Sequence, residues 1–263
     1  MKKTLIALAV AASAVVSSSA MAWNPGGAGG SFDIGGTITP EVKGTPWVVK
    51  VGGMTGLNAS ITKGAESIDV PVTNDISILG IRTQTAEAFP GQAGISPRID
   101  YHGNVNLASG SWGKVELSLP VLNSETEEKI GTLRTLMQTG GGVSVANSSS
   151  SANDGIYSVR ANNDAYAFYG GLPHRGNNEF GGALNIVKFF DGEVDDNFNF
   201  QGFEDRTFSR FKAVKFDEKG TYSAFYGSGI ATGETFTITL DSAAAADQPI
   251  NWKSSMPITV TYQ

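Results

Sequence analysis

Short segments in which apolar and polar residues alternate recur along this chain, and they constrain its fold more than any other feature. Alternation with a period of two is typical of β-strands that bury one face. Clusters of Gly, Asn, Asp, Ser and Pro separate the segments, as turns require. The pattern predicts strands at 47–51, 67–72, 77–81, 98–101, 114–119, 130–137, 234–240 and 257–262.

Repeated short strands with this spacing favour an all-β fold, specifically an immunoglobulin-like β-sandwich. The chain contains no cysteine, so packing and sheet hydrogen bonds must stabilise it without disulfides. Short helices are expected only between Asp154 and Phe190, where four residues have roughly helical spacing: Tyr157, Ala161, Ala165 and Phe168.

The chain is longer than such a sandwich needs, which is about 100 residues. Its composition changes over about 140–216, from the low-complexity stretch GGGVSVANSSSSANDG to an aromatic-rich stretch and then to the acidic stretch DGEVDDNFNFQGFED. We expect residues 41–263 to form one domain, with this segment inserted as a subdomain that contains short helices. Long excursions of this kind often carry function.

Residues 1–22 have the pattern of a secretory signal peptide. Lys2 and Lys3 form a basic start, a mainly apolar run follows, and Ala20-Met21-Ala22 is an A-x-A cleavage site. Loss of the two lysines would change the net charge from -6 to -8 (-6 minus 2). We therefore expect an exported protein, and the negative charge disfavours nucleic acid as a partner.

Catalytic motifs do not stand out in the sequence. The histidines are His102 and His174, the motifs HExxH and GxSxG do not occur, and a cysteine nucleophile is impossible. We expect no enzymatic activity and no cofactor. A secreted β-sandwich hydrolase that uses His102 is the enzymatic alternative, and it is the least favoured interpretation.

The acidic stretch has one feature of a calcium loop. Asp195, Asn197 and Asn199 alternate as in an EF-hand, but Phe200 stands where that loop needs glycine. A solvated acidic hairpin without a metal is the better interpretation.

Aromatic residues of the expected insert allow two interpretations, a sugar-stacking surface or a small core of their own. Phe198 and Phe200 would share one face of a strand and are expected to be buried. Tyr169 and Phe203 lie beside glycines and are the candidates for glycan binding.

Both ends of the mature chain also alternate like strands. The segment GGSFDIGGTITP, residues 29–40, places four residues on one face: Phe32, Ile34, Gly36 and Ile38. The last residues, MPITVTYQ, do the same with Met256, Ile258, Val260 and Tyr262. Most domains hold their last residues loosely, so this terminal pattern is unusual.

Five stretches carry a family resemblance: MKKTLIALAVAAS, FDIGGTIT, AFYGGL, YGSGIATGETFTITL and PITVTYQ. They sample both ends and the middle of the chain. The chain resembles the subunits of fimbriae assembled by the chaperone-usher pathway. It is most similar to the large, cysteine-free subunits and adhesins of the Fae (kappa) class of enteric bacteria.

The resemblance implies a sandwich that lacks its last strand and has a groove between unpaired strand edges. A periplasmic chaperone would fill the groove first, and the N-terminal extension of a neighbouring subunit would replace it after delivery to the outer-membrane usher. Residues 23–40 would be that extension, with the donor strand formed by Phe32, Ile34, Gly36 and Ile38. The strand that pairs with the chaperone or the donor would contain Met256, Ile258, Val260 and Tyr262.

The apolar side chains of the donor segment would not suffice to hold it in a groove. Burial of Phe32, Ile34 and Ile38 would contribute roughly 5 to 9 kcal/mol. Fixing about eight residues costs on the order of 8 to 16 kcal/mol of backbone entropy. Main-chain hydrogen bonds to a preformed groove must supply the difference.

The sequence thus predicts a structural subunit of cell-surface fimbriae that contributes to adhesion, and a minor subunit within the family. The alternative is a carbohydrate-binding adhesin of the same architecture, which would bind host glycans through Tyr169 and Phe203.

Overall fold

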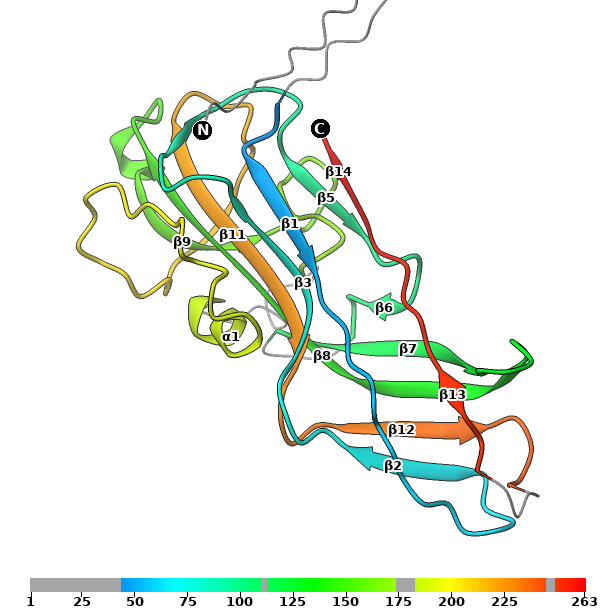
Figure 1. The fold of residues 1–263 in the computed structure, drawn as a ribbon. Helices are drawn as coiled ribbons and strands as arrows, with labels where there is room; N and C mark the ends of the chain where they lie inside the picture. Colours follow the sequence, from blue (N-terminus) through cyan, green and yellow to red (C-terminus); the bar gives the residue numbers. More distant parts are fainter. Residues whose placement is uncertain (1–43, 110–112, 174–182, 245–248) are drawn as a thin grey trace, which may run out of the picture. The chain divides into compact units, whose positions relative to one another are not determined.

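The computed structural model describes residues 44–109, 113–173, 183–244 and 249–263, and nearly all of its regular structure is β (Figure 1). The first half of the chain forms β1 (Trp47–Val51), β2 (Ser67–Pro71), β3 (Ile76–Thr83), β4 (Phe89–Pro90), β5 (Pro97–Asp100), β6 (Val105–Asn106) and β7 (Lys114–Asn123). The second half forms β8 (Lys129–Ala146), β9 (Gly155–Arg160), β10 (Phe211–Ala213), β11 (Thr221–Ile230), β12 (Thr235–Leu240), β13 (Trp252–Lys253) and β14 (Thr259–Tyr262). The helices among the described residues are a 3₁₀ turn at Ser151–Asn153 and α1 (Ala183–Phe190). None of the described helices is long and apolar enough to cross a membrane.

The long strand β8 organises the main sheet. Its C-terminal half pairs with β11 and its N-terminal half with β12, so β11 and β12 together act as one bent neighbour. Next to them, β3 pairs with β11 and β2 pairs with β12 in the same way. Figure 1 shows the resulting change of direction between the β3–β11 half of the sheet and the β2–β12 half. At the bend, the Val72 N–H donates to the Glu234 carbonyl at 2.9 Å, and the Gly233 N–H donates to the Val72 carbonyl at 2.9 Å.

Further strands extend the two halves of this sheet. One half has the order β1-β3-β11-β8-β9, with β10 parallel to β9 at its end. The other has the order β2-β12-β8-β7, and β6 and β13 pair with β7. A separate two-stranded sheet, β14-β5, packs against the main core. The architecture is a β-sandwich with few helices, which confirms the predicted fold class.

The main core lies between these layers and is rich in aromatic rings. Trp47 packs at ring-centroid distances of 5.2 Å from Phe89 and 5.3 Å from Phe216. The indole N–H of Trp47 donates a 2.6 Å hydrogen bond to the Ile95 carbonyl, which ties β1 to the chain just before β5. This end of the sandwich is therefore closed by the chain itself.

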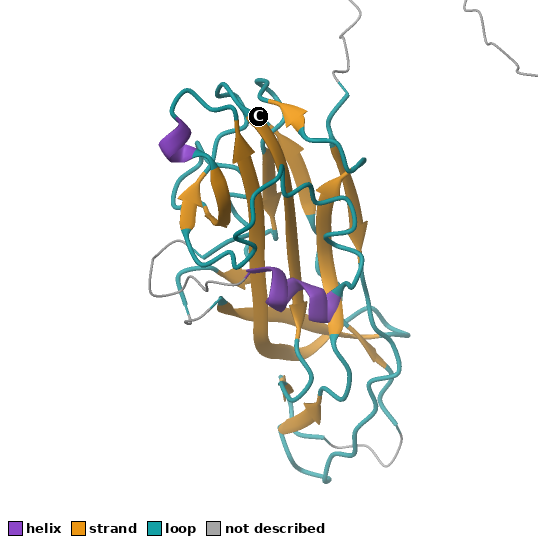
Figure 2. Cartoon of the chain, turned by 90° about the vertical axis from the view of Figure 1, so that its left-hand side faces the viewer, coloured by secondary structure: helices purple, strands orange, loops and turns teal. Residues whose placement is uncertain are grey.

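A second, smaller core covers the other face of the main sheet. It contains Ile156, Val187, Val194, Phe198, Phe208 and Phe225, with Phe200 and Phe203 partly buried against it. Figure 2 shows α1 lying across the long strands. The helix fits there because the sheet has glycines beneath it: a Cβ on Gly227 would lie 2.7 Å from the Val187 Cβ, and one on Gly229 would lie 2.4 Å from the Phe190 ring.

All eight predicted strands correspond to strands of the structure. The stretch GGGVSVA, expected in a loop, is instead the C-terminal half of β8, where Gly142 leaves room for the rings of Phe208 and Phe225. The expected inserted segment therefore contributes β9 and β10 to the sheet as well as α1. Helix α1 lies within the range expected for short helices, but none of the four residues with helical spacing is in a helix. Tyr157 lies in β9, and Ala161, Ala165 and Phe168 lie in turns and loops.

We expect Gly227→Val to destabilise the protein by about 1 to 3 kcal/mol, because the added side chain would overpack the contact between β11 and α1. Chemical denaturation of the purified protein measures this loss. Gly53→Ala is the control, since a Cβ on Gly53 would meet nothing within 4 Å. Equal denaturation midpoints for the two variants would contradict the proposed role of the glycine.

Candidate functional site: an uncovered apolar groove

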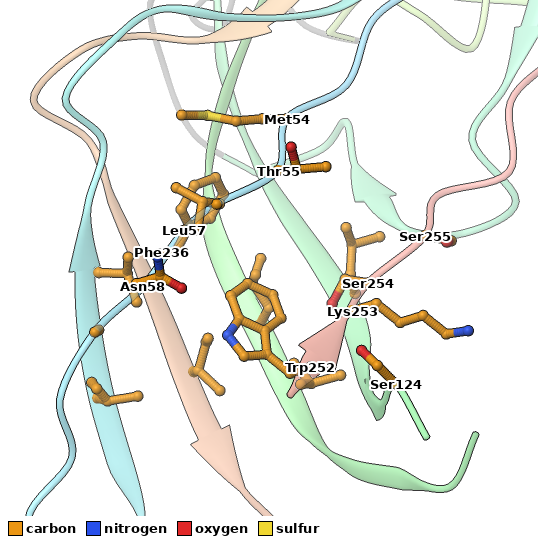
Figure 3. A pocket seen from close by; sticks show the side chains of 18 of the residues that line it. Met54, Thr55, Leu57, Asn58, Ser124, Phe236, Trp252, Lys253, Ser254 and Ser255 are labelled. Carbon is orange, nitrogen blue, oxygen red and sulfur yellow. The ribbon is translucent and has the colours of Figure 1, made fainter. Parts of the chain in front are cut away.

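A large apolar cavity opens between the segment that follows β1 and the C-terminal segment. Its volume is about 1130 Å³. The floor is the β2–β12–β8–β7 half of the main sheet, with Leu117, Leu133 and Phe236 among its residues. Figure 3 shows Leu57 and Trp252 facing this space from opposite sides. We call this cavity the groove.

The first edge of the groove is β1. Among the described residues this strand pairs with β3 alone, from Trp47 opposite Thr83 to Val51 opposite Leu79. Trp47, Val49 and Val51 share one face of the strand. Trp47 is 4% exposed, but Val49 and Val51 are 43% and 61% exposed. The core-facing side of β1 is thus covered at its start and uncovered toward its end.

The second edge is the C-terminal segment. In the part of the chain that the structure describes, β14 pairs with β5 alone, with Val260 opposite Ile99. The four residues predicted for this edge alternate as half-buried positions and pack against the main core: Met256, Ile258, Val260 and Tyr262. Met256 and Ile258 line the groove itself.

The two edges approach each other at the closed end of the sandwich. Burial raises the pKa of Tyr262, and a hydrogen bond with Thr45, just before β1, partly offsets this effect. The last residue is held as well: Gln263 and Ser96 exchange two main-chain hydrogen bonds of 2.9 and 3.0 Å. Arg98 also donates to the Gln263 side chain at 2.6 Å. The C-terminal strand is therefore tied to β5 and to the residues just before β1 at this end of the sandwich.

Comparison with known proteins identifies the family. The model of the family described as "Fimbrial, major and minor subunit" matches residues 1–263. The chain belongs to this family of fimbrial subunits. It is similar to the K88 fimbrial protein AC of Escherichia coli, with 32% identity over 289 residues that cover the whole of both chains. It is also similar to the K88 fimbrial protein AB (31% over 291 residues) and the F41 fimbrial protein (28% over 287 residues) of the same species, again over both full lengths.

Family membership makes this chain a fimbrial subunit, a structural rather than a catalytic class of protein. The donor-strand residues predicted from the sequence lie outside the described residues: Phe32, Ile34, Gly36 and Ile38. His174 lies outside them too. His102 joins β5 to the C-terminal edge, since its Nε2 lies 2.8 Å from the Thr259 Oγ1.

The two candidate glycan-binding residues of this fimbrial subunit lie against different cores. Tyr169 is partly buried against the main core, with the Arg98 guanidinium carbon 5.7 Å from its ring centroid. Phe203 is partly buried against the second core. Both rings therefore contribute to packing, and the structure does not join them in one surface.

The acidic stretch is tied to the sheet instead of forming a solvated hairpin. Asp195 forms an ion pair of 2.9 Å with Lys188. The side-chain amides of Asn197 and Asn199 donate to main-chain carbonyls at the end of β3 and just beyond it. No cluster of three or more potential metal ligands from His, Cys, Asp and Glu occurs among the described residues.

Sequence reasoning missed Trp252 as a groove residue. The half-buried alternation of the C-terminal segment begins at Trp252 and continues through Ser254 to Met256. This longer run was a usable signal, because period-two alternation in NWKSSMPITVTY includes the tryptophan. The groove wall at Met54 and Leu57 carried no such signal, since that segment contains no regular strand.

A buried tyrosine pair connects the β5 layer to β11. The Tyr226 hydroxyl donates to the Gly171 carbonyl at 2.9 Å and lies 2.8 Å from the Tyr101 hydroxyl, which is 3.0 Å from the Ser228 Oγ. A chain of donors from Ser228 through Tyr101 and Tyr226 to Gly171 satisfies all these groups. Burial raises the pKa of Tyr101 to about 12, and the two hydrogen bonds oppose this rise.

We expect Tyr101→Phe to lower the free energy of unfolding by about 1 to 3 kcal/mol at neutral pH, because it leaves buried hydrogen-bonding groups without a partner. The raised pKa adds a pH dependence. The neutral phenol stabilises the fold fully below pH 10, and this contribution is lost as the pH rises toward about 12. The free energy of unfolding, measured by urea denaturation between pH 8 and 11.5, should therefore fall more steeply with pH for the wild type than for the variant. Parallel curves would contradict this assignment.

Proposed function

We propose that this fimbrial subunit polymerises by donor-strand exchange, with the groove as the acceptor site. The observation that carries the proposal is an apolar groove that lies between the end of β1, at Val51, and the segment 249–258 that leads into β14. Within the described residues, β1 and β14 are each paired on one side only. An extended peptide that adds to such edges gains main-chain hydrogen bonds, while its alternate side chains enter the groove. Phe32, Ile34, Gly36 and Ile38 of a neighbouring subunit have this alternation.

The exposed positions of β1 support a strand-shaped occupant. Val49 and Val51 lie on the core-facing side of β1, where a buried valine would contribute about 1.5 to 3 kcal/mol more than an exposed one. Met256 and Ile258 are half-buried on the opposite border. A strand laid between the two borders would cover both sets of side chains at once.

Such a groove also needs a temporary occupant before assembly. Unpaired strand edges beside an apolar surface promote aggregation. A periplasmic chaperone that lends a strand would cover the groove after export, and the outer-membrane usher would then allow exchange with the next subunit. The mature subunit would reside in a fimbrium at the cell surface.

Removal of the N-terminal extension tests whether it is the donor strand. We expect a subunit that lacks residues 23–39 to bind its chaperone but to donate no strand, because its groove is intact and its extension is missing. Recovery of chaperone complexes, followed by gel analysis of polymers, measures both properties. Unchanged incorporation at internal positions of fimbriae would contradict donor-strand exchange.

A charged residue at the groove border tests whether the groove is the acceptor site. Val51→Glu places a carboxylate where an inserted strand would bury it, so we expect at least a 100-fold loss in strand acceptance. Val48→Glu is the matched control, since Val48 is 42% exposed and lies on the opposite face of the same strand. Equal losses in the two variants would argue against the groove as the acceptor.

The sequence-based assignment to a minor subunit concerns position within the fimbria. The family includes major and minor subunits. We propose the minor position, for which a low copy number along assembled fimbriae, counted by immunogold labelling, is the expected result. Labelling along the whole shaft would make it a major subunit.

The alternative function, carbohydrate binding through the inserted segment, predicts a different result. Because Tyr169 and Phe203 pack against the two cores, we expect Tyr169→Ala and Phe203→Ala to lower stability rather than to remove a binding activity. Glycan arrays probed with strand-complemented protein, together with thermal unfolding, separate the two effects. Loss of glycan binding at unchanged stability would favour the adhesin.

A further inference from the structure

The segment that follows α1 is fastened along β3 on the face opposite the groove. We call residues 191–199 the acidic strap. Its contacts with β3 and the following residues run in sequence order: Arg82 with the Glu193 carbonyl and the Asp196 carboxylate, Thr83 and Gln84 with Asn197, and Ala86 with Asn199. The strap thus lies along β3, the strand that pairs with β1.

The first residue of the strap reaches past β3 to β1. The Asp191 N–H donates to the Val187 carbonyl at 3.0 Å, and its Oδ1 accepts from the Glu193 N–H at 3.1 Å. Its Oδ2 lies 3.1 Å from the Lys50 Nζ. The side chain of Asp191 is only 10% exposed, so its carboxylate is held in place on both oxygens.

The sheet has a glycine where this carboxylate lies. Gly80 of β3 is the register partner of Lys50, and a Cβ on Gly80 would stand 3.4 Å from the Asp191 Oδ2. Asp191 raises the pKa of Lys50 through a hydrogen bond and through its charge, and Glu193 adds to this at 3.6 Å. The carboxylate therefore lies in van der Waals range of the Gly80 backbone position.

Lys50 lies between Val49 and Val51, the two exposed valines on the core-facing side of β1, of which Val51 lines the groove. The Lys50 side chain points to the opposite side, toward the strap. The ion pair therefore holds β1 from behind, at the residues where its front face is uncovered. A strand with one paired neighbour has few other contacts to fix its position.

We propose that Lys50 and Asp191 are positioning residues for strand acceptance: they hold the β1 edge in the geometry that an incoming strand pairs with. The inference rests on the proposed function, since it assigns a role within donor-strand exchange. An edge that is ordered in advance loses less conformational freedom when it binds, which favours binding. The strap thereby connects α1 to the β1 edge without contacting the incoming strand.

The test uses the full chain in complex with its chaperone and a fluorescent peptide of residues 29–40 as donor. We expect Lys50→Met and Asp191→Asn to take up the peptide about two- to fivefold more slowly, the effect of losing one partly exposed ion pair. Lys50→Arg should restore uptake. Raising NaCl from 50 to 500 mM should slow the wild type and leave Lys50→Met nearly unchanged.

Lys188→Met is the matched control. It removes a strap ion pair with Asp195 of similar length, 2.9 Å, and similar burial, but Lys188 lies on α1 and this ion pair does not involve a residue of β1. Normal uptake by this variant, together with unchanged thermal unfolding of Lys50→Met, supports a positioning role. Equal slowing by Lys188→Met and Lys50→Met would overturn it, as would wild-type rates in Lys50→Met. If the wild type itself takes up no peptide, the proposed function fails and this inference fails with it.

Discussion

One constraint shapes the structure: β1 and β14 each have a single paired neighbour among the described residues, and an apolar groove lies between the end of β1 and the segment that leads into β14. Strand edges and apolar side chains both need partners, the first for hydrogen bonds and the second for burial. The Trp47 indole and the Gln263 main chain close one end of the sandwich, and α1 covers the outer face of the main sheet.

The two faces of the sheet therefore have different partners. On the outer face, glycines of β8 and β11 lower the surface so that α1 and a cluster of phenylalanines pack directly on the strands. On the groove face, the same sheet presents large apolar residues such as Leu117 and Phe236, and the residues that pack over the main core here, among them Leu57 and Trp252, are themselves only partly buried. The chain supplies its own cover for one face, and under the proposed function a neighbouring subunit supplies it for the other.

The sequence predicted the fold where one side of a strand is buried, because only then do side chains alternate. This is why the C-terminal edge was located to within two residues, including the half-buried set from Met256 to Tyr262. It failed for β9 and β11, whose residues are buried almost without interruption, so that TYSAFYGSGI shows no period of two. Contacts such as Lys50 with Asp191 join distant parts of the chain, and no local pattern encodes them. The donor residues Phe32 to Ile38 remain a prediction because they lie outside the described residues.

The 18 residues of β8 have a consequence for how this protein responds to local opening. One strand passes through both halves of the bent sheet and pairs with β7, β9, β11 and β12. Neither half is then an independent cooperative unit, because exposing the amides of one half disturbs the register of the strand that serves the other. Fraying that starts at the open groove is resisted by hydrogen bonds at the far end of the sheet. A subunit with an incomplete sandwich thus retains a continuous backbone ladder that keeps the groove floor in shape.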